Sequence, residues 1–484
     1  MKILFVASEV TPFAKTGGLA DVTGSLPKIL KEMEHDVRII MPYYKIVDQS
    51  GSTIRKGRKG VEIEMEGGAQ KGLLRQTSLN DIPVYLVENR EYFQREFLYG
   101  SPSGDYPDND RRFAFFCRAV LQLLKRMDFR PDIIHCHDWQ TALIPILLKH
   151  EHKEDPFFMR TAVIYTIHNL AYQGIFPEES LLEMGLDPSY FTVDRLEYYG
   201  KVNLMKGAIL TTDVINTVSE TYCREIQTPE VGCGMEGLLQ QRGHDLYGIM
   251  NGLDYSRWDP ETDMEIAKNY TVSTLSGKVA NKKRLQKTLG LDQVKDIPLL
   301  AMVSRLSAQK GLDIVEPLLS KFEKEKLQLV ILGVGDDKYM QLLQDFKATA
   351  PRNISINLEF KPHLAHQIYA GSDMFLMPSH YEPCGLGQLI ALRYGSVPIV
   401  RKTGGLGDSV FDSRDGYKEP NGFTFDEYTS EAFWEAITRA LEAYGEKKKW
   451  EKMVRNGMNA DFSWEKSARK YDELYRKALK KIFA

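Results

Sequence analysis

Two cationic side chains, Arg305 and Lys310, lie on one short segment that directly follows the apolar run 299–303. A diphosphate leaving group keeps its charges at pH 7, so an enzyme that releases it needs fixed cations of this kind. Arginine offers a planar fork of donors, and lysine offers a point charge. Solvated surface charge is the alternative interpretation, but the position after a buried strand favours an anion site.

A carboxylate, Glu382, follows Pro378-Ser379-His380 at the end of another apolar run. We expect it at a strand-to-helix junction, where it could accept hydrogen bonds from sugar hydroxyls. The alternative is a charge at a helix N-terminus, worth about 0.3–1 kcal/mol. Cys384 is expected to be a small buried apolar side chain and not a nucleophile, because no paired base is evident.

Gly-Gly-Leu turns occur in both halves of the chain. The first contains Lys15, Gly17, Gly18 and Asp21, and the second contains Thr403, Gly404 and Gly405. Paired glycines let backbone N–H groups approach an anion, and a following helix N-terminus adds about half a positive charge. The first turn is neither a P-loop nor a GxGxxG motif. Each alone fits a plain tight turn, whereas the pair favours two anion-tolerant loops.

Histidines follow two further apolar runs. His168 directly follows the run 162–167, which places it at a strand end, although a lone histidine is more often structural. His135 and His137 stand two positions apart on a predicted strand and therefore point the same way, with Asp138 beside them. No third ligand or supporting shell is visible in the sequence, so we expect no metal.

Short apolar runs ending in polar clusters alternate with amphipathic stretches along the chain. The runs fit strands buried on both faces of a parallel sheet, and the stretches fit helices. The apolar runs are 3–7, 133–134, 162–167, 214–218, 299–303, 329–332, 374–377 and 397–400, and the amphipathic stretches are 21–34, 112–127, 312–326 and 337–349. This alternation predicts a doubly wound α/β fold, whose ligands bind at the carboxyl ends of the strands.

The strand-and-cluster pattern appears twice, before about residue 245 and after about residue 297. We therefore predict an N-terminal Rossmann-like domain over 1–245, a C-terminal one over 246–460 and a terminal helix over 461–484, with two sheets facing a cleft. A turn is expected at 250–254 near the boundary, and a hairpin-like excursion at 51–80.

The composition excludes several classes of protein. Lys and Arg number 63 against 66 Asp and Glu, so no overall field draws in nucleic acid or a membrane. The 5 cysteines are sparse and lack a CxxC spacing, which argues against a disulfide framework or a structural zinc and indicates a cytoplasmic protein. No apolar stretch of about 20 residues exists, so we expect no membrane span.

A series of motifs, in order along the chain, resembles those of bacterial glycogen synthases and plant starch synthases. The motifs are KTGGLAD (15–21), HDW (137–139), TIHNLAYQG (166–174), GMEGL (234–238), NGLD (251–254), SRL (304–306), QKG (309–311), EPCGL (382–386) and TGGL (403–406). The resemblance runs from Met1 to the closing Asp461-Phe462-Ser463-Trp464.

The resemblance implies a GT-B fold of two Rossmann-like domains whose last helix crosses back to the N-terminal domain. The N-terminal domain would take the glucan acceptor and the C-terminal domain the nucleotide-sugar donor. The implied activity is transfer of α-glucose, usually from ADP-glucose, to the non-reducing end of an α-1,4-glucan with retention. No metal or other cofactor is implied. The donor is either ADP-glucose or UDP-glucose, and the sequence does not predict the oligomeric state.

The resemblance also assigns roles to residues. Arg305 and Lys310 would hold the diphosphate, and His168 would face the glucose. Glu382 would lie near the glucose, in a pocket lined by Cys384, Gly385 and Leu386, and the donor loop would contain Thr403, Gly404 and Gly405. The N-terminal side of the donor site would be formed by Lys15, Gly17, Gly18 and Asp21, and the contacts to sugar or acceptor by Asp138 and Asn251. One position departs from the wider pattern: many related transferases carry a second glutamate where this chain has Ile390. That difference speaks against Glu382 acting as half of a carboxylate pair.

Three other functions remain open at this point. A transferase of the same fold could glucosylate another acceptor, giving sucrose, trehalose or a lipid product. A binding module without catalysis would be expected to have lost one of Lys15, Arg305, Lys310 and Glu382. The third is a glycoside hydrolase or a phosphorylase. A hydrolase would usually need two paired carboxylates, and none can be paired from the sequence. A phosphorylase would need a lysine that carries pyridoxal and a far longer chain.

Overall fold

The computed structural model describes residues 1–101, 104–349 and 351–483, and the chain folds as two compact units. The first unit contains residues 1–218, 223–252 and the C-terminal segment from Trp464 onward, and the second contains 219–222 and 253–463. The first unit therefore extends beyond the predicted limit at residue 245. No helix in the described part of the chain is long and apolar enough to cross a membrane.

The first unit is built on a sheet in the order β14-β13-β9-β8-β1-β2-β5-β4-β3. Its strands are β1 (Lys2–Val6), β2 (Asp36–Pro42), β3 (Arg55–Met65), β4 (Gly68–Leu79), β5 (Ile82–Glu88), β8 (Ile133–His137), β9 (Ala162–Ile167), β13 (Val214–Thr217) and β14 (Leu246–Gly248). All neighbouring pairs are parallel except β5 with β4 and β4 with β3. The continuous apolar runs are buried, as a sheet covered on both faces requires.

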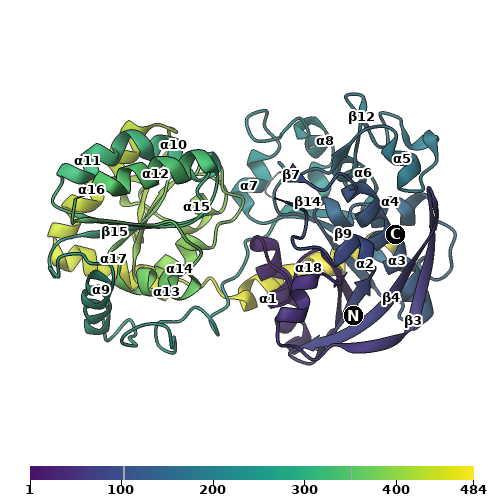
Figure 1. The fold of residues 1–484 in the computed structure, drawn as a ribbon, viewed down its shortest axis with the longest axis horizontal. Coiled ribbons are helices and arrows are strands. Elements are labelled where there is room, and N and C mark those ends of the chain that lie inside the picture. The colour runs from purple at the N-terminus through teal and green to yellow at the C-terminus, as the bar shows by residue number, and fades with distance from the viewer. Residues whose placement is uncertain (102–103, 350, 484) are drawn as a thin grey trace. The chain divides into compact units, whose positions relative to one another are not determined.

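Helices cover both faces of this sheet (Figure 1). They are α1 (Gly18–Glu32), α2 (Arg90–Phe93), α3 (Asn109–Met127), α4 (Leu143–His150), α5 (Ser180–Glu183), α6 (Leu204–Thr211), α8 (Glu236–Gln241) and α18 (Trp464–Phe483). The C-terminal helix α18 packs against α1 and β9, and α4 packs against α3 and α6. The predicted return of the last helix to the N-terminal domain is confirmed.

Two excursions leave the layers of the first unit. The predicted hairpin at 51–80 is confirmed as β3 and β4, which form the antiparallel edge of the sheet. A second excursion was not predicted from the sequence, because its strands are very short. It holds a small antiparallel sheet of β10 (Ile175–Phe176), β12 (Lys201–Asn203) and β11 (Glu197–Tyr198), and the pair β6 (Gly100–Ser101) and β7 (Gly104–Asp105) lies apart from it.

The second unit is a fully parallel sheet in the order β17-β16-β15-β18-β19-β20. Counted along the unit, this is the order 3-2-1-4-5-6 of dinucleotide-binding folds. Its elements are β15 (Leu299–Val303), β16 (Gln328–Leu332), β17 (Ile354–Asn357), β18 (Met374–Met377), β19 (Val397–Arg401), β20 (Phe423–Phe425), α9 (Ser276–Thr288), α10 (Leu312–Val315), α11 (Leu319–Lys324), α12 (Asp337–Thr349), α13 (Pro362–Gly371), α14 (Gly387–Arg393), α15 (Gly404–Ser409), α16 (Ser430–Gly445) and α17 (Lys447–Asn459). Figure 1 shows α10, α11 and α12 on one side of the sheet and α13, α14 and α17 on the other. The helix α7 (Glu220–Glu225) begins in the segment that groups with this unit.

Two local predictions were wrong. The helix expected over 312–326 is broken into α10 and α11 by a short 3-10 stretch that contains Pro317, which cannot donate the helical N–H bond. The turn expected at 250–254 is absent from this part of the described chain, where Leu253 pairs with Ser463 in an isolated parallel bridge. A Cβ on Gly252 would lie 2.6 Å from the Trp464 Cα, so this glycine allows two backbones to approach closely.

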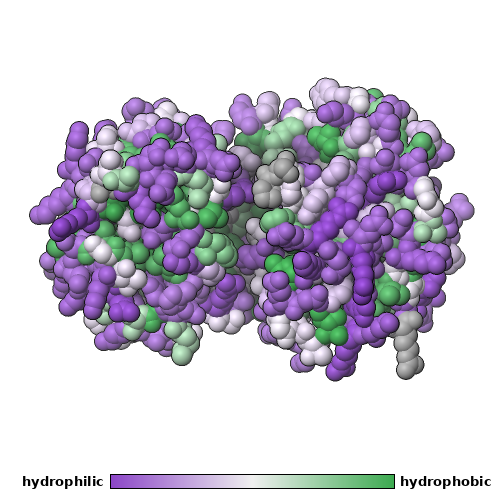
Figure 2. All heavy atoms as spheres, in the orientation of Figure 1, coloured by the Kyte–Doolittle hydropathy of each residue, from purple (hydrophilic) through white to green (hydrophobic). Residues whose placement is uncertain are grey.

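Each doubly wound sheet has a point where the strand order reverses, which is where such folds bind ligands. In the first unit that point lies between β1 and β8, and in the second it lies between β15 and β18. The predicted doubly wound α/β architecture is therefore confirmed in each unit. Polar residues cover most of the visible surface of both units, with apolar side chains scattered among them (Figure 2).

Candidate functional site

The strongest cluster of predicted residues lies at the reversal point of the second sheet. Lys310, on the segment after β15, places its Nζ 2.5 Å from Oε2 of Glu382, which follows β18. The Ser379 hydroxyl donates to the same oxygen at 3.0 Å. The Glu382 residue is only 6% exposed, so this ion pair is held in a largely desolvated position. The pair brings a cation and a carboxylate to the same strand edge.

Glycines allow the segments around Glu382 to pack backbone against backbone. A Cβ on Gly404 would lie 1.9 Å from the Glu382 carbonyl oxygen, and one on Gly405 would lie 2.0 Å from the Cys384 carbonyl oxygen. Gly404 also has a φ of +45°, and the Gly405 N–H donates to the Glu382 carbonyl at 3.1 Å. The second Gly-Gly-Leu turn therefore fixes the Glu382 segment, a function that the sequence analysis missed.

The other residues of the Glu382 segment have distinct environments. Cys384 is buried, as predicted for an apolar side chain. Gly385 has a φ of +73°, a conformation that favours glycine. Leu386 precedes α14 and is partly exposed, while Thr403 precedes α15 and is buried. Ile390, which stands where related transferases carry a second acid, is an apolar side chain buried within α14.

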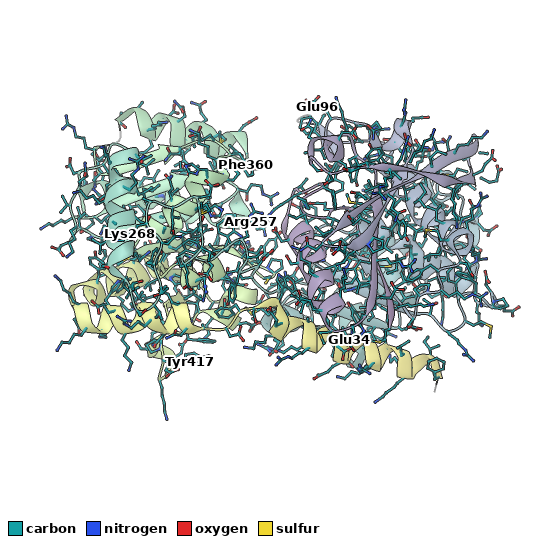
Figure 3. All side chains as sticks on the ribbon, turned by 90° about the horizontal axis from the view of Figure 1, so that it is seen from below. Glu34, Glu96, Arg257, Lys268, Phe360 and Tyr417 are labelled. Carbon is teal, nitrogen blue, oxygen red and sulfur yellow. The ribbon has the colours of Figure 1, made fainter. Side chains whose placement is uncertain are left out.

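Arg305 lies on the same segment as Lys310 but is differently placed. Its side chain is exposed, and its one hydrogen bond in the described part of the chain goes from Nη2 to Gln309 Oε1 at 3.3 Å. An exposed guanidinium with so little internal bonding is available to an anion. Phe360 follows β17 at the carboxyl edge of the same sheet, and its side chain is largely exposed (Figure 3). The sequence analysis did not select it as a site residue.

In the first unit, the reversal point is organised by a residue that the sequence analysis did not select, Glu9. Its Oε2 accepts hydrogen bonds from the backbone N–H groups of Thr16 and Gly17, at 2.5 and 3.1 Å. Its Oε1 accepts from the Thr16 hydroxyl at 2.6 Å and from the Tyr99 hydroxyl at 2.7 Å. Glu9 could have been selected from the sequence, because it is an acidic residue close behind the first buried strand. Glu9 therefore sets the conformation of the first Gly-Gly-Leu turn.

The first Gly-Gly-Leu turn leaves its outer side open. Lys15 Nζ donates to both carboxylate oxygens of Asp21, at 2.6 and 2.7 Å. A Cβ at Gly17 or Gly18 would meet nothing within 4 Å, and Gly17 has an extended φ of −146° that any residue adopts. Neither internal packing nor backbone conformation therefore demands these glycines. Their small size leaves room for a ligand to approach the N-terminus of α1.

Asp138 follows β8 and has an unusual backbone, with a φ of +58°. Its Oδ1 accepts the His168 backbone N–H at 2.7 Å, which joins two strand ends. Burial, together with the nearby charge of Glu9, raises the pKa of Asp138 to about 8, although hydrogen bonds from the backbone N–H groups of His168 and Asn169 lower it. The carboxyl is therefore protonated at neutral pH and can donate a hydrogen bond. A strained, neutral acid at a strand end is typical of a functional position.

His168 lies beside Asp138 and is 9% exposed. Its Nε2 is 3.0 Å from Nδ1 of the buried His137. Burial lowers the pKa of His168 to about 3, so the ring is neutral near pH 7. Among the described residues, no group of three or more His, Cys, Asp or Glu side chains is arranged to hold a metal ion.

The structure brings together some of the predicted residues and leaves others apart. It pairs Lys310 with Glu382, Lys15 with Asp21, and Asp138 with His168. Asn251 follows β14 and is buried, and its Oδ1 has no hydrogen-bond partner within the described ranges. Each unit thus carries its own group of candidate residues at its reversal point.

Comparisons with known proteins agree with this division. Residues 2–241 match the family model of the starch synthase catalytic domain, and residues 289–459 match that of the glycosyl transferases group 1. The chain is 66% identical over 481 residues to a glycogen synthase of Geotalea daltonii, with 99% of both chains covered. It is 57% identical over 478 residues to glycogen synthase 2 of Geobacter sulfurreducens, again covering 99% of both.

Solved structures give the same result. The catalytic domain of starch synthase IV from Arabidopsis thaliana, bound to ADP and acarbose, matches with a TM-score of 0.91 at 35% identity and covers 99% of both chains. A sucrose-phosphate synthase from Thermosynechococcus elongatus matches with a TM-score of 0.59 at 15% identity, which shows a shared fold alone. The predicted GT-B fold is confirmed by these matches. The chain belongs to the glycogen synthase and starch synthase family of glycosyltransferases.

Proposed function

We propose that this protein transfers α-glucose from ADP-glucose to the non-reducing end of an α-1,4-glucan such as glycogen, with retention of the anomeric configuration. The observation that carries the proposal is the Lys310–Glu382 pair, with exposed Arg305 nearby in sequence, at the reversal point of a 3-2-1-4-5-6 sheet. A nucleotide binds at this point in related folds. The relatives named glycogen synthase, and the plant relative solved with ADP, support the same donor.

Breaking the glucosyl–phosphate bond creates negative charge on the diphosphate and positive charge on the sugar. In the proposed reaction Arg305 and Lys310 hold the diphosphate, because no proton neutralises it at pH 7. Lys310 would leave Glu382 for the diphosphate, so that the Glu382 carboxylate faces the developing positive charge. The acceptor proton would pass to the leaving phosphate, which gives attack on the same face of the sugar.

Residues of the first unit also have roles in the proposed reaction. Lys15, Gly17, Gly18 and Asp21 would contact the donor, and His168, Asp138 and Asn251 would contact sugar hydroxyls of donor or acceptor. The proposal requires water to be excluded from the bound donor, because the donor would otherwise hydrolyse. No metal takes part in the proposed step, since the two cations serve the diphosphate.

The proposed location is the cytoplasm. All five cysteines lie in the described part of the chain, and no disulfide joins any of them, which supports a reducing compartment.

The experiment that tests the function measures the initial rate of labelled glucose incorporation into glycogen or amylopectin. ADP-glucose and UDP-glucose are compared as donors, with and without a chelator, and sucrose- or trehalose-forming acceptors serve as controls. Incorporation into glucan from ADP-glucose is expected. If neither donor gives incorporation into glucan, the proposed function is wrong; faster transfer to a free sugar or a lipid would assign another acceptor.

A further inference from the structure

His137, a buried side chain outside the predicted site, contacts His168 directly. It is 0% exposed, and its Nδ1 is 3.0 Å from His168 Nε2. The Phe5 ring stacks on the His137 ring with a centroid distance of 5.6 Å, and the His135 ring lies at 4.1 Å. These neighbours hold the orientation of the His137 ring. Its hydrogen bond therefore bears on how His168 presents its own nitrogens.

Each of the two rings carries a single N–H. Burial lowers the pKa of His137 well below its usual value and that of His168 to about 3, so both are neutral near pH 7. A neutral imidazole has one nitrogen that donates and one that accepts. The bond between His137 Nδ1 and His168 Nε2 therefore has two possible directions, and each direction fixes the tautomers of both rings.

The other nitrogen of His137 decides between these directions. His137 Nε2 is buried and has no hydrogen-bond partner in the part of the chain that the structure describes. A proton on Nε2 would bury a donor without an acceptor, which is rarer in proteins than an unused acceptor. The proton is therefore on Nδ1 and is donated to His168 Nε2. This leaves His168 with its own proton on Nδ1.

His135 cannot reverse this assignment, because its two nitrogens are already used. The Thr166 hydroxyl donates to Asn216 Oδ1 at 2.7 Å, so toward His135 Nε2, at 2.6 Å, it must accept. His135 Nδ1 then accepts from the Tyr475 hydroxyl at 2.9 Å. The two histidines of strand β8 thus have opposite tautomers, and only His137 acts on His168.

We propose that His137 is a positioning residue that fixes the tautomer of His168, so that His168 presents an Nδ1–H donor to an oxygen of the bound sugar. This inference rests on the proposed function for the identity of the substrate. His168 Nδ1 has no protein partner within the described ranges, and its residue retains some exposure, so the donor is available to a ligand. The Nδ1–H donates to a sugar hydroxyl oxygen, which accepts, and it disfavours a ligand group that can only donate.

A matched pair of variants separates the hydrogen bond from packing. His137→Asn places an amide N–H close to the position of Nδ1, whereas His137→Leu has nearly the same size and shape but no donor. Both remove the same ring volume and should lower the thermal unfolding midpoint similarly. We expect kcat in H137L to be about ten-fold below that in H137N, because one hydrogen bond of this kind is lost. Equal kcat values in the two variants would overturn the inference.

A spectroscopic measurement tests the tautomer without using activity. In protein with ¹⁵N-labelled histidine rings, protonated and bare nitrogens give well-separated signals, and His168→Asn assigns the signals of His168. We expect Nδ1 of His168 to be protonated in the wild-type protein and both tautomers to appear in H137L. A wild-type His168 protonated on Nε2 would overturn the inference. Absence of glucose transfer by the wild type would instead refute the proposed function and leave the tautomer result standing.

Discussion

Replacing Lys310 with alanine removes the cation that neutralises Glu382. The Lys310 side chain is 20% exposed and that of Glu382 is 7% exposed, with 2.5 Å between Nζ and Oε2. Breaking a fully buried pair of this kind costs 3–5 kcal/mol, and partial exposure of Lys310 reduces this to about 2 kcal/mol. For a unit of roughly 200 residues, that loss lowers the unfolding midpoint by roughly 4–8 °C. The rate of transfer should fall by about 10²-fold, since a charge contact to the diphosphate is lost.

A second buried pair in the same unit provides the control. Lys282 Nζ lies 2.5 Å from Asp373 Oδ2, and both side chains are largely buried. Asp373 precedes β18, so this pair lies at the amino edge of the sheet, opposite to Glu382. Lys282→Ala should lower the unfolding midpoint at least as much as Lys310→Ala and leave kcat unchanged. Differential scanning fluorimetry and labelled-glucose transfer to glycogen give the two readouts.

The double variant Lys310→Ala/Glu382→Gln separates stability from catalysis. An amide at position 382 can still accept from Ser379, which donates at 3.0 Å, and it carries no unpaired charge. We expect it to recover most of the lost stability and none of the lost activity. Near-normal transfer by Lys310→Ala with either nucleotide donor would remove Lys310 from the mechanism and refute this reasoning.

Arg305→Ala should raise the KM for the donor about ten-fold, because a cation that binds the diphosphate is lost. It should not lower the unfolding midpoint, because the only hydrogen bond of the Arg305 side chain within the described residues is to Gln309. A midpoint several degrees lower would contradict this expectation. Glu9→Gln weakens the charge-assisted hydrogen bonds from the backbone N–H groups of Thr16 and Gly17. The kcat/KM for the donor should therefore fall about ten-fold, while the KM for glycogen stays unchanged. An equal loss for both substrates would contradict a role of Glu9 in the donor loop. The pKa of Asp138 is raised from 3.8 to about 8, so the folded protein keeps a proton that the unfolded chain loses, and wild-type stability falls as pH rises between these values. The difference between the unfolding midpoints of Asp138→Asn and the wild type should therefore grow from pH 5 to pH 8 and stay constant above pH 8. A difference that is the same at every pH would show that the pKa of the Asp138 carboxyl is not raised. Transfer measured in excess chelator should equal the untreated rate, and a loss that added Mg²⁺ restores would contradict the proposed metal-free step.

The strands and most helices were predictable because their patterns are local. The run 299–303 coincides with β15, and the stretch 337–349 coincides with α12. Buried parallel strands are continuously apolar, and their ends show as polar clusters, so both the fold and the strand-end residues can be read without contacts. The prediction of one helix over 312–326 was wrong because Pro317 interrupts it, although this proline was visible in the sequence.

The partners of the candidate residues could not be predicted in the same way. Glu9 and Tyr99 meet through a hydrogen bond across ninety positions of sequence, and no periodicity encodes that contact. Gly404 resembles Gly18 in its motif, yet Gly404 is fixed by the Glu382 carbonyl, whereas Gly18 has open space beside it. Two similar motifs thus have different physical causes, which only the packing reveals.

The first unit is completed by the last helix of the chain. Tyr471 and Tyr475 of α18 end the buried hydrogen-bond chain that runs through Asn216, Thr166 and His135. During synthesis on the ribosome, the polar groups of Asn216 and His135 lack these tyrosine partners until α18 has left the exit tunnel. The second unit, by contrast, has its whole sheet available earlier. The half of the molecule that is made first is therefore the half that finishes folding last, and a stop codon before residue 471 harms the oldest part of the nascent chain.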